Sequence, residues 1–398
     1  MSTNYFISHD KSMCSGCAAC QQACPAGALT MVTDEEGFLF PDKDLSTCIE
    51  CGLCERICPF SSPDYSNFEK PAIFATYLRQ QNERERSSSG GLFYLIAEHV
   101  IENGGTVYGA ALDENLQCHH QKAGSIRELR PLRSSKYVQS AIEDVYIQVK
   151  QDLKEGRLVY FSGTPCQVAG LKAFLRKKYN NLVTSDLICH GVPNQMLFND
   201  HLQYLENKTG KKVVAYKFRD DENWGVCESA FYADSQTPVK LPGYHSSPFL
   251  YGFIKGMTFR YSCYNCKFAR LPRQGDITLA DFWGVLDVFP DIDVKGGVSM
   301  IAVNSELGSK IWNSVKGKTV YRESTVDIAA RNHNFTKVSP MPPERADVYR
   351  IVREKGYPFA ARTIFRAPVR LRASFAIKAF IRRLFGFNNI QKIKNLLK

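Results

Sequence analysis

Apolar and polar residues alternate in blocks that predict helices and strands in turn through the middle of the chain. Residues 90–105 (GGLFYLIAEHVIENGG) place apolar side chains on one face of a helix, and a glycine pair ends the pattern. Residues 106–112 then predict a strand, residues 140–156 a second amphipathic helix, and residues 158–163 a second strand. This succession of helices and strands predicts an α/β fold.

A cysteine lies at one predicted strand-to-helix corner. Residues 158–161 (LVYF) predict a buried strand, residues 162–165 (SGTP) a tight turn, and a helical pattern follows from Val168. Corners of this kind carry ligand sites in α/β folds. Cys166 is therefore a candidate nucleophile, metal ligand or small buried residue. The pattern of the other cysteines in the sequence distinguishes between these roles.

Length and composition are those of an ordinary globular protein. The 398 residues leave room for two or three domains, with 44% hydrophobic and 23% charged residues. The sequence has no apolar run long enough to cross a membrane and no signal-peptide pattern at its start, which predicts a cytoplasmic protein. Thiols are kept reduced in that compartment, so fourteen cysteines point to metal binding rather than to disulfides.

The positive charge is concentrated in the last part of the chain. Residues 361–398 hold ten Lys or Arg and no Asp or Glu, which accounts for nearly all of the net charge of +11. The remainder is close to neutral, so no nucleic-acid partner is expected. The tail predicts a basic amphipathic helix, which suits either the inner face of a membrane or docking on the body or on a partner subunit. Its apolar stripe is Ile377, Phe380, Ile381, Leu384 and Phe385, with Lys378, Arg382 and Arg383 elsewhere around the helix.

Two copies of the pattern C-x2-C-x2-C-x3-C-P stand near the N-terminus, beginning at Cys14 and Cys48. In this pattern three cysteines bind one 4Fe-4S cluster, and the fourth reaches across to the other cluster. A pair of zinc sites is the alternative, although a doubled triple-cysteine run does not suit tetrahedral zinc. The expected ligands are Cys14, Cys17, Cys20 and Cys58 for the first cluster, and Cys24, Cys48, Cys51 and Cys54 for the second.

The N-terminal segment resembles a bacterial-type ferredoxin domain with two 4Fe-4S clusters, in which residues 29–42 would form a hairpin. We therefore expect an α+β dicluster domain followed by a larger α/β domain and a basic C-terminal helix. The predicted boundaries are residues 1–62 for the ferredoxin-type domain, 63–70 for a polar linker, 71–340 for the α/β domain and 341–398 for the tail.

Six cysteines lie beyond the two runs, and four of them occupy turn-like settings. Cys263 and Cys266 form a C-x2-C pair, and with Cys166 and Cys189 they would make four ligands, enough for a third 4Fe-4S cluster. A zinc knuckle or a redox dithiol would use the same pair, and Cys166 with His190 as its base would suit nucleophilic catalysis. The remaining two, Cys118 and Cys227, are expected to be plain thiols. The sequence contains no G-x-G-x-x-G, so a nicotinamide-binding half is not indicated.

These segments resemble the coenzyme F420 hydrogenase/dehydrogenase β-subunit family over roughly residues 70–320. The resemblance is carried by SGTPCQVAGLK, LICHGVP, FRYSCYNCKFARLPRQGDITLADFWGV, SSSGGLFYLIAEHVIENGGTVYGAAL, RSSKYVQS and KGGVSMIAVNSELGSKIW. The family binds FAD beside a 4Fe-4S cluster, so the resemblance implies an α/β domain that binds flavin and iron–sulfur. It also implies that the cluster ligands are Cys166, Cys189, Cys263 and Cys266.

The resemblance implies a flavin site as well. Residues 88–91 open a helix, where bare N–H groups suit a pyrophosphate, although an ordinary N-cap would look the same. A lysine in the SKYVQS segment would stabilise reduced flavin, a histidine beside a cluster ligand could shuttle a proton, and Asp276 and Asp281 would orient the loop after the cluster. The candidate catalytic residues are Lys136 and His190, and the candidate flavin contacts are Ser88, Ser89, Gly90, Gly91, Lys136, Tyr137, Gln139, Gly163 and Thr164.

Taken together, the sequence predicts an iron–sulfur flavoprotein oxidoreductase. Electrons would pass between the ferredoxin-type clusters, the third cluster and FAD, and a redox partner such as a ferredoxin or a dehydrogenase subunit would exchange them. Coenzyme F420 is a candidate cofactor through the family. The alternatives are a non-catalytic electron-transfer subunit of a larger complex and a redox enzyme of surface polysaccharide biosynthesis. Neither the substrate nor the oligomeric state follows from the sequence.

Overall fold

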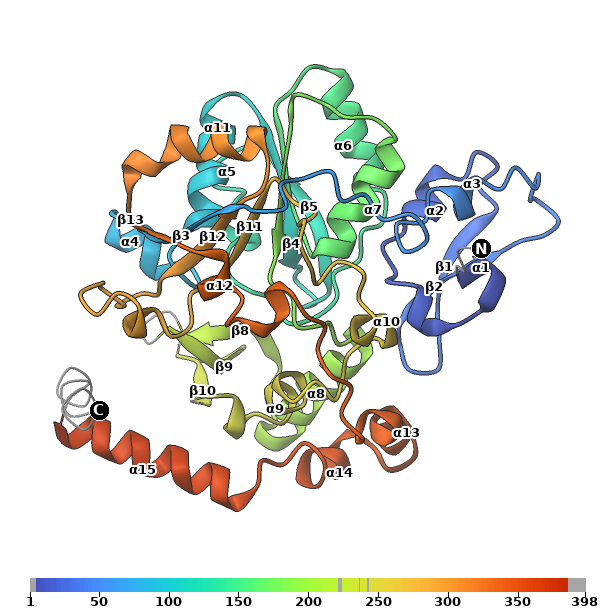
Figure 1. The fold of residues 1–398 in the computed structure, drawn as a ribbon. Coiled ribbons are helices and arrows are strands. Elements are labelled where there is room, and N and C mark those ends of the chain that lie inside the picture. The colour runs from blue at the N-terminus through green and yellow to red at the C-terminus, as the bar shows by residue number, and fades with distance from the viewer. Residues whose placement is uncertain (1–4, 221–223, 236, 242, 386–398) are drawn as a thin grey trace.

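The computed structural model describes residues 5–220, 224–235, 237–241 and 243–385. The chain forms a small N-terminal unit, a central eight-stranded sheet with helices on both faces, and a layer built around a three-stranded sheet (Figure 1). The α/β character predicted for the main part of the chain is confirmed.

The N-terminal unit is built around a two-stranded antiparallel sheet. Its strands β1 (Leu29–Thr33) and β2 (Leu39–Lys43) pair from Leu29 with Lys43 to Thr33 with Leu39, which confirms the predicted hairpin. The short helices of the unit are α1 (Tyr5–Ser8), α2 (Ala19–Ala23) and α3 (Leu53–Arg56). The unit lies beside α7 (Pro165–Leu175) and α10 (Tyr261–Tyr264), on the side of the molecule away from β13 (Thr319–Ser324) (Figure 1).

The central sheet is mixed. Its strand order is β13 (Thr319–Ser324), β3 (Ala72–Leu78), β12 (Ser299–Val303), β11 (Ile277–Asp281), β7 (Leu182–Leu187), β6 (Val159–Ser162), β4 (Thr106–Leu112) and β5 (Cys118–Ala123). The inner pairs β11–β7, β7–β6 and β6–β4 are parallel, and the pairs toward both edges are antiparallel. The parallel strands end at the same edge, so the segments that follow β6 and β7 lie close together.

Helices cover both faces of this sheet. One face carries α5 (Leu92–Glu102) and α11 (Glu306–Val315), and the other carries α6 (Val145–Lys154) and α7 (Pro165–Leu175). The predicted helix over residues 140–156 begins only at Val145, because Ala141 forms a bridge with His119 of β5. By contrast, α7 begins earlier than the pattern predicted, at Pro165, where the missing proline N–H leaves no hydrogen bond unmade.

A second core lies under the sheet. It combines the strands β8 (Val213–Asp220), β9 (Gly225–Tyr232) and β10 (Val239–Leu241) with α8 (Gln195–Thr209), α9 (Pro248–Ile254), α13 (Arg345–Lys355) and α14 (Tyr357–Arg362). Phe38 and Phe40 of the N-terminal unit belong to the same core, so the unit is packed against the body rather than tethered by its linker alone. The short helices α4 (Gln81–Glu85), α10 (Tyr261–Tyr264) and α12 (Val326–Ala329) complete the body.

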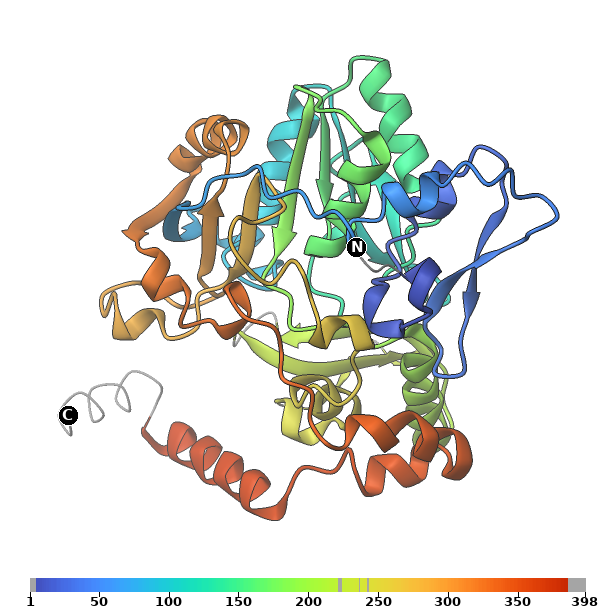
Figure 2. The ribbon, with the colours of Figure 1, turned by 45° about the vertical axis from the view of Figure 1, so that its right-hand side comes forward.

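The basic tail contains α15 (Val369–Phe385), which runs along the lower edge of the molecule (Figure 2). In its first half, Phe375 stacks on His245 with the ring centroids 4.0 Å apart, and Ile377 is exposed. The rest of the predicted stripe, namely Phe380, Ile381, Leu384 and Phe385 with Lys378, Arg382 and Arg383, lies outside the side chains that the structure describes. Within the described part of the chain, no helix combines the length and apolar character needed to span a membrane.

Two buried arginines fasten the N-terminal unit to the body. Arg345 on α13 pairs with both carboxylate oxygens of Glu36, at 3.0 and 2.5 Å, and its Nε donates to the carbonyl of Phe259 at 2.7 Å. Arg260 donates to the carbonyls of Cys14 at 2.6 Å and Leu39 at 2.8 Å. Both guanidinium groups are almost fully buried, so these bonds are shielded from water and salt.

We expect Arg345→Met to destabilise the protein strongly, because it leaves Glu36 with a partly buried charge and no partner. Loss of one member of a buried pair costs about 3 kcal/mol of unfolding free energy. Arg350→Met is the matched control on the same helix, since Arg350 is half exposed and pairs with Asp347 and Glu354 at the surface. It should change stability by no more than about 0.5 kcal/mol. Urea denaturation under anaerobic conditions measures both, and equal effects would contradict the prediction.

Candidate functional site

Four cysteines from separate parts of the body line one cavity. Cys166 stands in the first turn of α7, Cys189 follows β7, Cys263 lies on α10 and Cys266 comes just after it. The same cavity is lined by Thr164, His190, Arg260 and Arg273, among others. The structure thus brings together the four cysteines that the resemblance selected, and Cys118 and Cys227 are not among the residues that line the cavity.

The turn before α7 is held by its own side chains. The backbone N–H of Thr164 donates to Gln167 Oε1 at 2.9 Å, and the Thr164 hydroxyl lies 3.1 Å from Cys166 Sγ. After β7, Gly191 has a φ of +138°, and a Cβ there would come within 2.3 Å of the Phe259 ring. Only glycine fits at position 191, so the chain can pack closely against Phe259 while Cys189, two residues earlier, lines the cavity.

Burial dominates the chemistry of these thiols. It raises the pKa of Cys166 to about 11 and that of Cys189 to about 12, while Arg260 acts on Cys166, and Arg273 on Cys189, in the opposite direction. A nucleophilic cysteine needs a lowered pKa, so this setting does not favour the nucleophile alternative for Cys166.

Two buried positive groups border the cavity with unused hydrogen-bond donors. Arg260 Nη1 and Arg273 Nε find no hydrogen-bond partner among the described residues, although both side chains are almost fully buried. Unpaired buried donors on cationic groups are costly unless a negative group lies beside them. Arg273 already has the buried carboxylate of Asp186 at 3.4 Å, whereas no ion pair of Arg260 is found among the described residues. Four thiolates around an iron–sulfur cluster carry a net negative charge, so Arg260 in the lining of the cavity fits such a cluster.

The arrangement of the sulfurs fits a cubane better than a single ion. Among the described residues, no three His, Cys, Asp or Glu side chains are placed to hold one metal ion. Tetrahedral zinc draws its four ligands to one point, whereas a cubane takes each thiolate on a different iron and keeps the sulfurs apart around a volume. The four cysteines line one cavity, and no three of them are placed around a single metal position.

A second cavity contains the first predicted ligand set of the N-terminal unit. It is lined by Cys14, Cys17, Cys20 and Cys58. Burial raises the pKa of Cys17 to about 12. The other set is more open: Cys24 follows α2, Cys54 lies on α3 and Cys51 is exposed. The helices α2 and α3 pack against each other, which keeps Cys24 near the run that begins at Cys48.

The two cysteine cavities adjoin. Ser15 and Phe60 line both of them. The helix α7 passes so close that a Cβ on Gly170 would lie 2.9 Å from Cys17 Cβ. On the apolar side, Cys58 of one set and Cys166 and Cys266 of the other pack on the cluster formed by Phe60, Ala169 and Phe268.

The start of α5 has the features expected of an anion site. No side chain caps this helix end, and its N-cap Gly91 has a left-handed backbone with a φ of +88°. The hydroxyl of Ser89 is buried and finds no hydrogen-bond partner among the described residues. Arg219 donates to the carbonyl of Ser88 at 2.8 Å and pairs with Asp281 at 2.6 Å. Gly90 allows close packing, since a Cβ there would lie 2.4 Å from the carbonyl of Thr76.

The SKYVQS segment lies between the start of α5 and the cysteine cavity. Lys136 Nζ donates to the carbonyls of Pro131 and Arg133, each at 2.7 Å, and burial lowers its pKa to about 7. The ammonium group is thus held by its own loop. Tyr137 accepts a hydrogen bond from Arg219 at 3.1 Å, and its ring stacks on Phe253 with the centroids 4.5 Å apart.

Other predicted flavin contacts have partners within the protein. Gln139 donates to the carbonyl of Ser15 at 2.9 Å, and the N–H of Gly163 donates to the carbonyl of Ser185 at 3.1 Å. Thr164 lines the cysteine cavity. Gln139, Gly163 and Thr164 therefore contact the cysteine cavities or the sheet, and the hydrogen bonds named here do not connect them to residues 88–91. The carboxylate of Asp276 accepts from the N–H and hydroxyl of Thr184, which ties β11 to β7.

Sequence reasoning missed several residues that line or hold these cavities. Ser15 and Phe60 are shared by both, and Arg260 connects one cavity to the Cys14 carbonyl of the other. Their only signal in the sequence is their place beside cysteines, in CSGC, CPF and FRYSC. An arginine next to a cysteine pair could have been read as a counter-charge for a thiolate site.

Comparison with known proteins agrees with this geometry. Residues 156–328 match the family described as the C terminus of the beta subunit of coenzyme F420 hydrogenase/dehydrogenase, and residues 13–62 match the 4Fe-4S dicluster domain. A search of curated proteins finds no match to the chain.

Among solved structures, one similar chain comes from the xenon-derivatised F420-reducing [NiFe] hydrogenase complex of Methanosarcina barkeri. The identity is 14% and the TM-score 0.47, with 68% of this chain and 91% of that chain covered. This identity and this TM-score carry no conclusion about the present chain. The two family matches include all the cysteines of both cavities. The chain is therefore an iron–sulfur protein with a 4Fe-4S dicluster match, and it is related through residues 156–328 to the C-terminal part of coenzyme F420 hydrogenase/dehydrogenase β subunits.

Proposed function

We propose that the protein is an iron–sulfur flavoprotein oxidoreductase, in which ferredoxin-type clusters exchange electrons with FAD through a third 4Fe-4S cluster. The observation that carries the proposal is the pair of adjoining cysteine cavities, which share Ser15 and Phe60. When bound, the clusters supply single-electron transfer and FAD supplies the exchange between single electrons and a hydride. The proposed ligands are the three cysteine sets named from the sequence.

The residues around the two cavities would keep the clusters close together and dry. The packing of α7 on Cys17 leaves room only for glycine at position 170. Phe60 and Phe268 meet edge to face, with centroids 5.4 Å apart, over Cys58 and Cys166. Such apolar packing excludes water and lowers the local dielectric, which is one of the ways a protein sets cluster potentials.

The start of α5 would hold the pyrophosphate of FAD. The uncapped helix end and the unpartnered Ser89 hydroxyl supply donors, and the ion pair of Arg219 with Asp281 holds the carbonyl of Ser88 beside them. Between Arg219 and the cysteine cavity stand the stacked rings of Tyr137, Phe253 and His190. These contacts link Arg219 to His190, which lines the cysteine cavity.

A second candidate function is that of a non-catalytic electron-transfer subunit. The matching family is described as a β subunit of a hydrogenase or dehydrogenase, which is consistent with work inside a larger assembly. The same description makes coenzyme F420 a candidate reaction partner of the flavin. The two functions differ in whether the isolated chain binds flavin and turns over a small electron acceptor.

Metal and flavin content test the proposal directly. We expect the protein purified without oxygen to hold about twelve irons and one FAD per chain. Cys166→Ser should lower the iron content to about eight, because it removes one ligand of the third cluster. Cys118→Ser is the control, since Cys118 is buried, donates to the carbonyl of Val138 and lies outside both cavities.

The iron and flavin contents distinguish the two candidate functions. An unchanged iron content in Cys166→Ser would remove the third cluster from the proposal. Full iron content without flavin would favour the electron-transfer subunit.

Thr164 offers a test that leaves every ligand in place. Its hydroxyl lies 3.1 Å from Cys166 Sγ and 3.0 Å from Gln167 Oε1. A cluster thiolate is the more negative acceptor, and a hydrogen bond donated to a cluster sulfur stabilises the reduced, more negative state. We therefore expect Thr164→Val to lower the reduction potential of the third cluster and Thr164→Ser to keep it near the original value. A redox titration followed by electron paramagnetic resonance measures both. A potential that is the same in all three proteins would show that this hydroxyl does not act on the cluster.

A further inference from the structure

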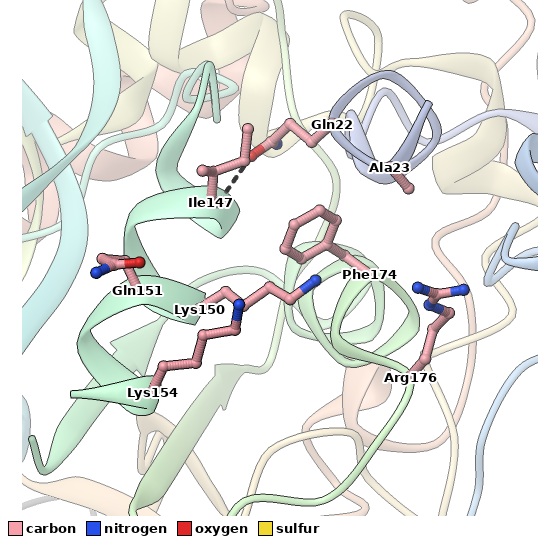
Figure 3. A pocket seen from close by; sticks show the side chains of 8 residues that line it. All are labelled: Gln22, Ala23, Ile147, Lys150, Gln151, Lys154, Phe174 and Arg176. Atoms are coloured by element: carbon pink, nitrogen blue, oxygen red, sulfur yellow. Dashed lines mark hydrogen bonds between the residues drawn. The ribbon is translucent and has the colours of Figure 1, made fainter. Parts of the chain in front are cut away.

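A basic groove lies at the seam between the N-terminal unit and the body. It measures about 280 Å³ and is bordered by α2, α6 and the end of α7 (Figure 3). Its lining residues are Gln22, Ala23, Ile147, Lys150, Gln151, Lys154, Phe174 and Arg176. Ala23 is the residue before Cys24, so the groove lies beside the more open of the two predicted cluster sites of the N-terminal unit.

The polar lining of the groove is made of hydrogen-bond donors and cations. Lys150 and Lys154 extend from α6, and Arg176 follows α7 on the other side (Figure 3). Gln22 Oε1 accepts from the N–H of Tyr146 at 2.9 Å, but its Nε2 is buried and finds no hydrogen-bond partner among the described residues. None of the described residues that line the groove is acidic.

The positive charges in the groove act on one another. The pKa of Lys150 is lowered, first by burial and then by the nearby charges of Lys154, Arg176 and Lys177. An arrangement of like charges costs free energy in the isolated protein. A bound group with negative charge would relieve this cost.

The charge of the groove contrasts with that of the N-terminal unit. Residues 5–62 contain eight Asp or Glu against three Lys or Arg, and two bound clusters would make the unit still more negative. An acidic partner is therefore repelled by most of the unit's surface. In the groove, positive side chains lie beside α2, the helix that carries Cys20 and is followed by Cys24.

We propose that this groove is the docking site of a small electron carrier with an acidic face, which exchanges electrons with the cluster next to Cys24. The proposal rests on the proposed function and adds to it the place and the charge of the partner. A carboxylate-rich surface fits the groove because Lys150, Lys154 and Arg176 supply the charge. Ile147 supplies an exposed apolar contact, and the buried Phe174 ring carries the Lys150 ammonium 5.1 Å from its centroid. Opposite charges on two partners raise their association rate and set their orientation.

The test uses the full chain with its clusters and a purified acidic plant-type 2Fe-2S ferredoxin as the probe. Isothermal titration calorimetry should show binding at low ionic strength that weakens as salt is added. The variant Lys150→Glu/Lys154→Glu/Arg176→Glu should bind at least about tenfold more weakly at low salt. Stopped-flow reduction by the same ferredoxin should slow by a similar factor.

A second triple variant controls for overall charge. Lys240→Glu/Lys295→Glu/Lys310→Glu changes the net charge equally at three exposed positions on β10, the loop before β12 and α11. It should bind and accept electrons like the unchanged protein. Reduced methyl viologen, which is cationic and small, should reduce all three proteins at similar rates, because it does not need the groove.

The outcomes separate the two proposals. Ferredoxin binding that survives the groove substitutions, or that falls equally in the control, would overturn the docking site while leaving the proposed function intact. Inhibition by inorganic phosphate beyond that of potassium chloride at equal ionic strength would mark the groove as a small-anion site and also overturn it. Failure of methyl viologen to reduce the unchanged protein would instead count against the proposed function.

Discussion

The burial of many cysteine sulfurs at one seam is the constraint on which the rest of the structure depends. Thiolates and the clusters they bind carry negative charge, and a buried negative charge needs a compensating partner. Arg260 has this position, because its side chain lines one cysteine cavity and donates to the carbonyl of Cys14 at the edge of the other. The guanidinium group of Arg260, which lies beside the cysteine sulfurs, thus also holds the two units together through a hydrogen bond. One side chain takes part in both the cysteine cavity and the contact between the two units.

The helix α7 explains why the seam can be so close. Its N-terminal turn brings Cys166 to one cavity, and one turn later the missing side chain of Gly170 lets Cys17 of the other unit pack against the backbone. The strands β6 and β7 come directly before and after α7 in the chain, so the sheet anchors both ends of this helix. A parallel sheet places the ends of β6 and β7 next to each other, so Cys166 and Cys189 arrive at the same edge although they are far apart in sequence.

The proposed path for electrons begins near the surface of the N-terminal unit. Cys51 is exposed, and Cys24 follows Ala23 of the basic groove. The cavity of Cys166 and Cys189 is lined by residues of both units. Beyond this cavity, the rings of His190, Phe253 and Tyr137 lead to Arg219 and the start of α5. This order agrees with a chain that receives electrons at its N-terminal unit.

The sequence by itself determined the dicluster domain, its hairpin and the α/β character of the body, because cysteine spacing and apolar periodicity are local patterns. It also grouped four body cysteines by their turn-like settings and the C-x2-C pair, but their spacing left zinc and nucleophile alternatives open, and only the family resemblance favoured a cluster. Only the tertiary structure decided that Gln139 and Thr164 serve the cysteine cavities, and that Ser15, Phe60 and Arg260 connect the two units. The physical reason is that these contacts join residues far apart in the chain, so no local pattern of residues encodes them.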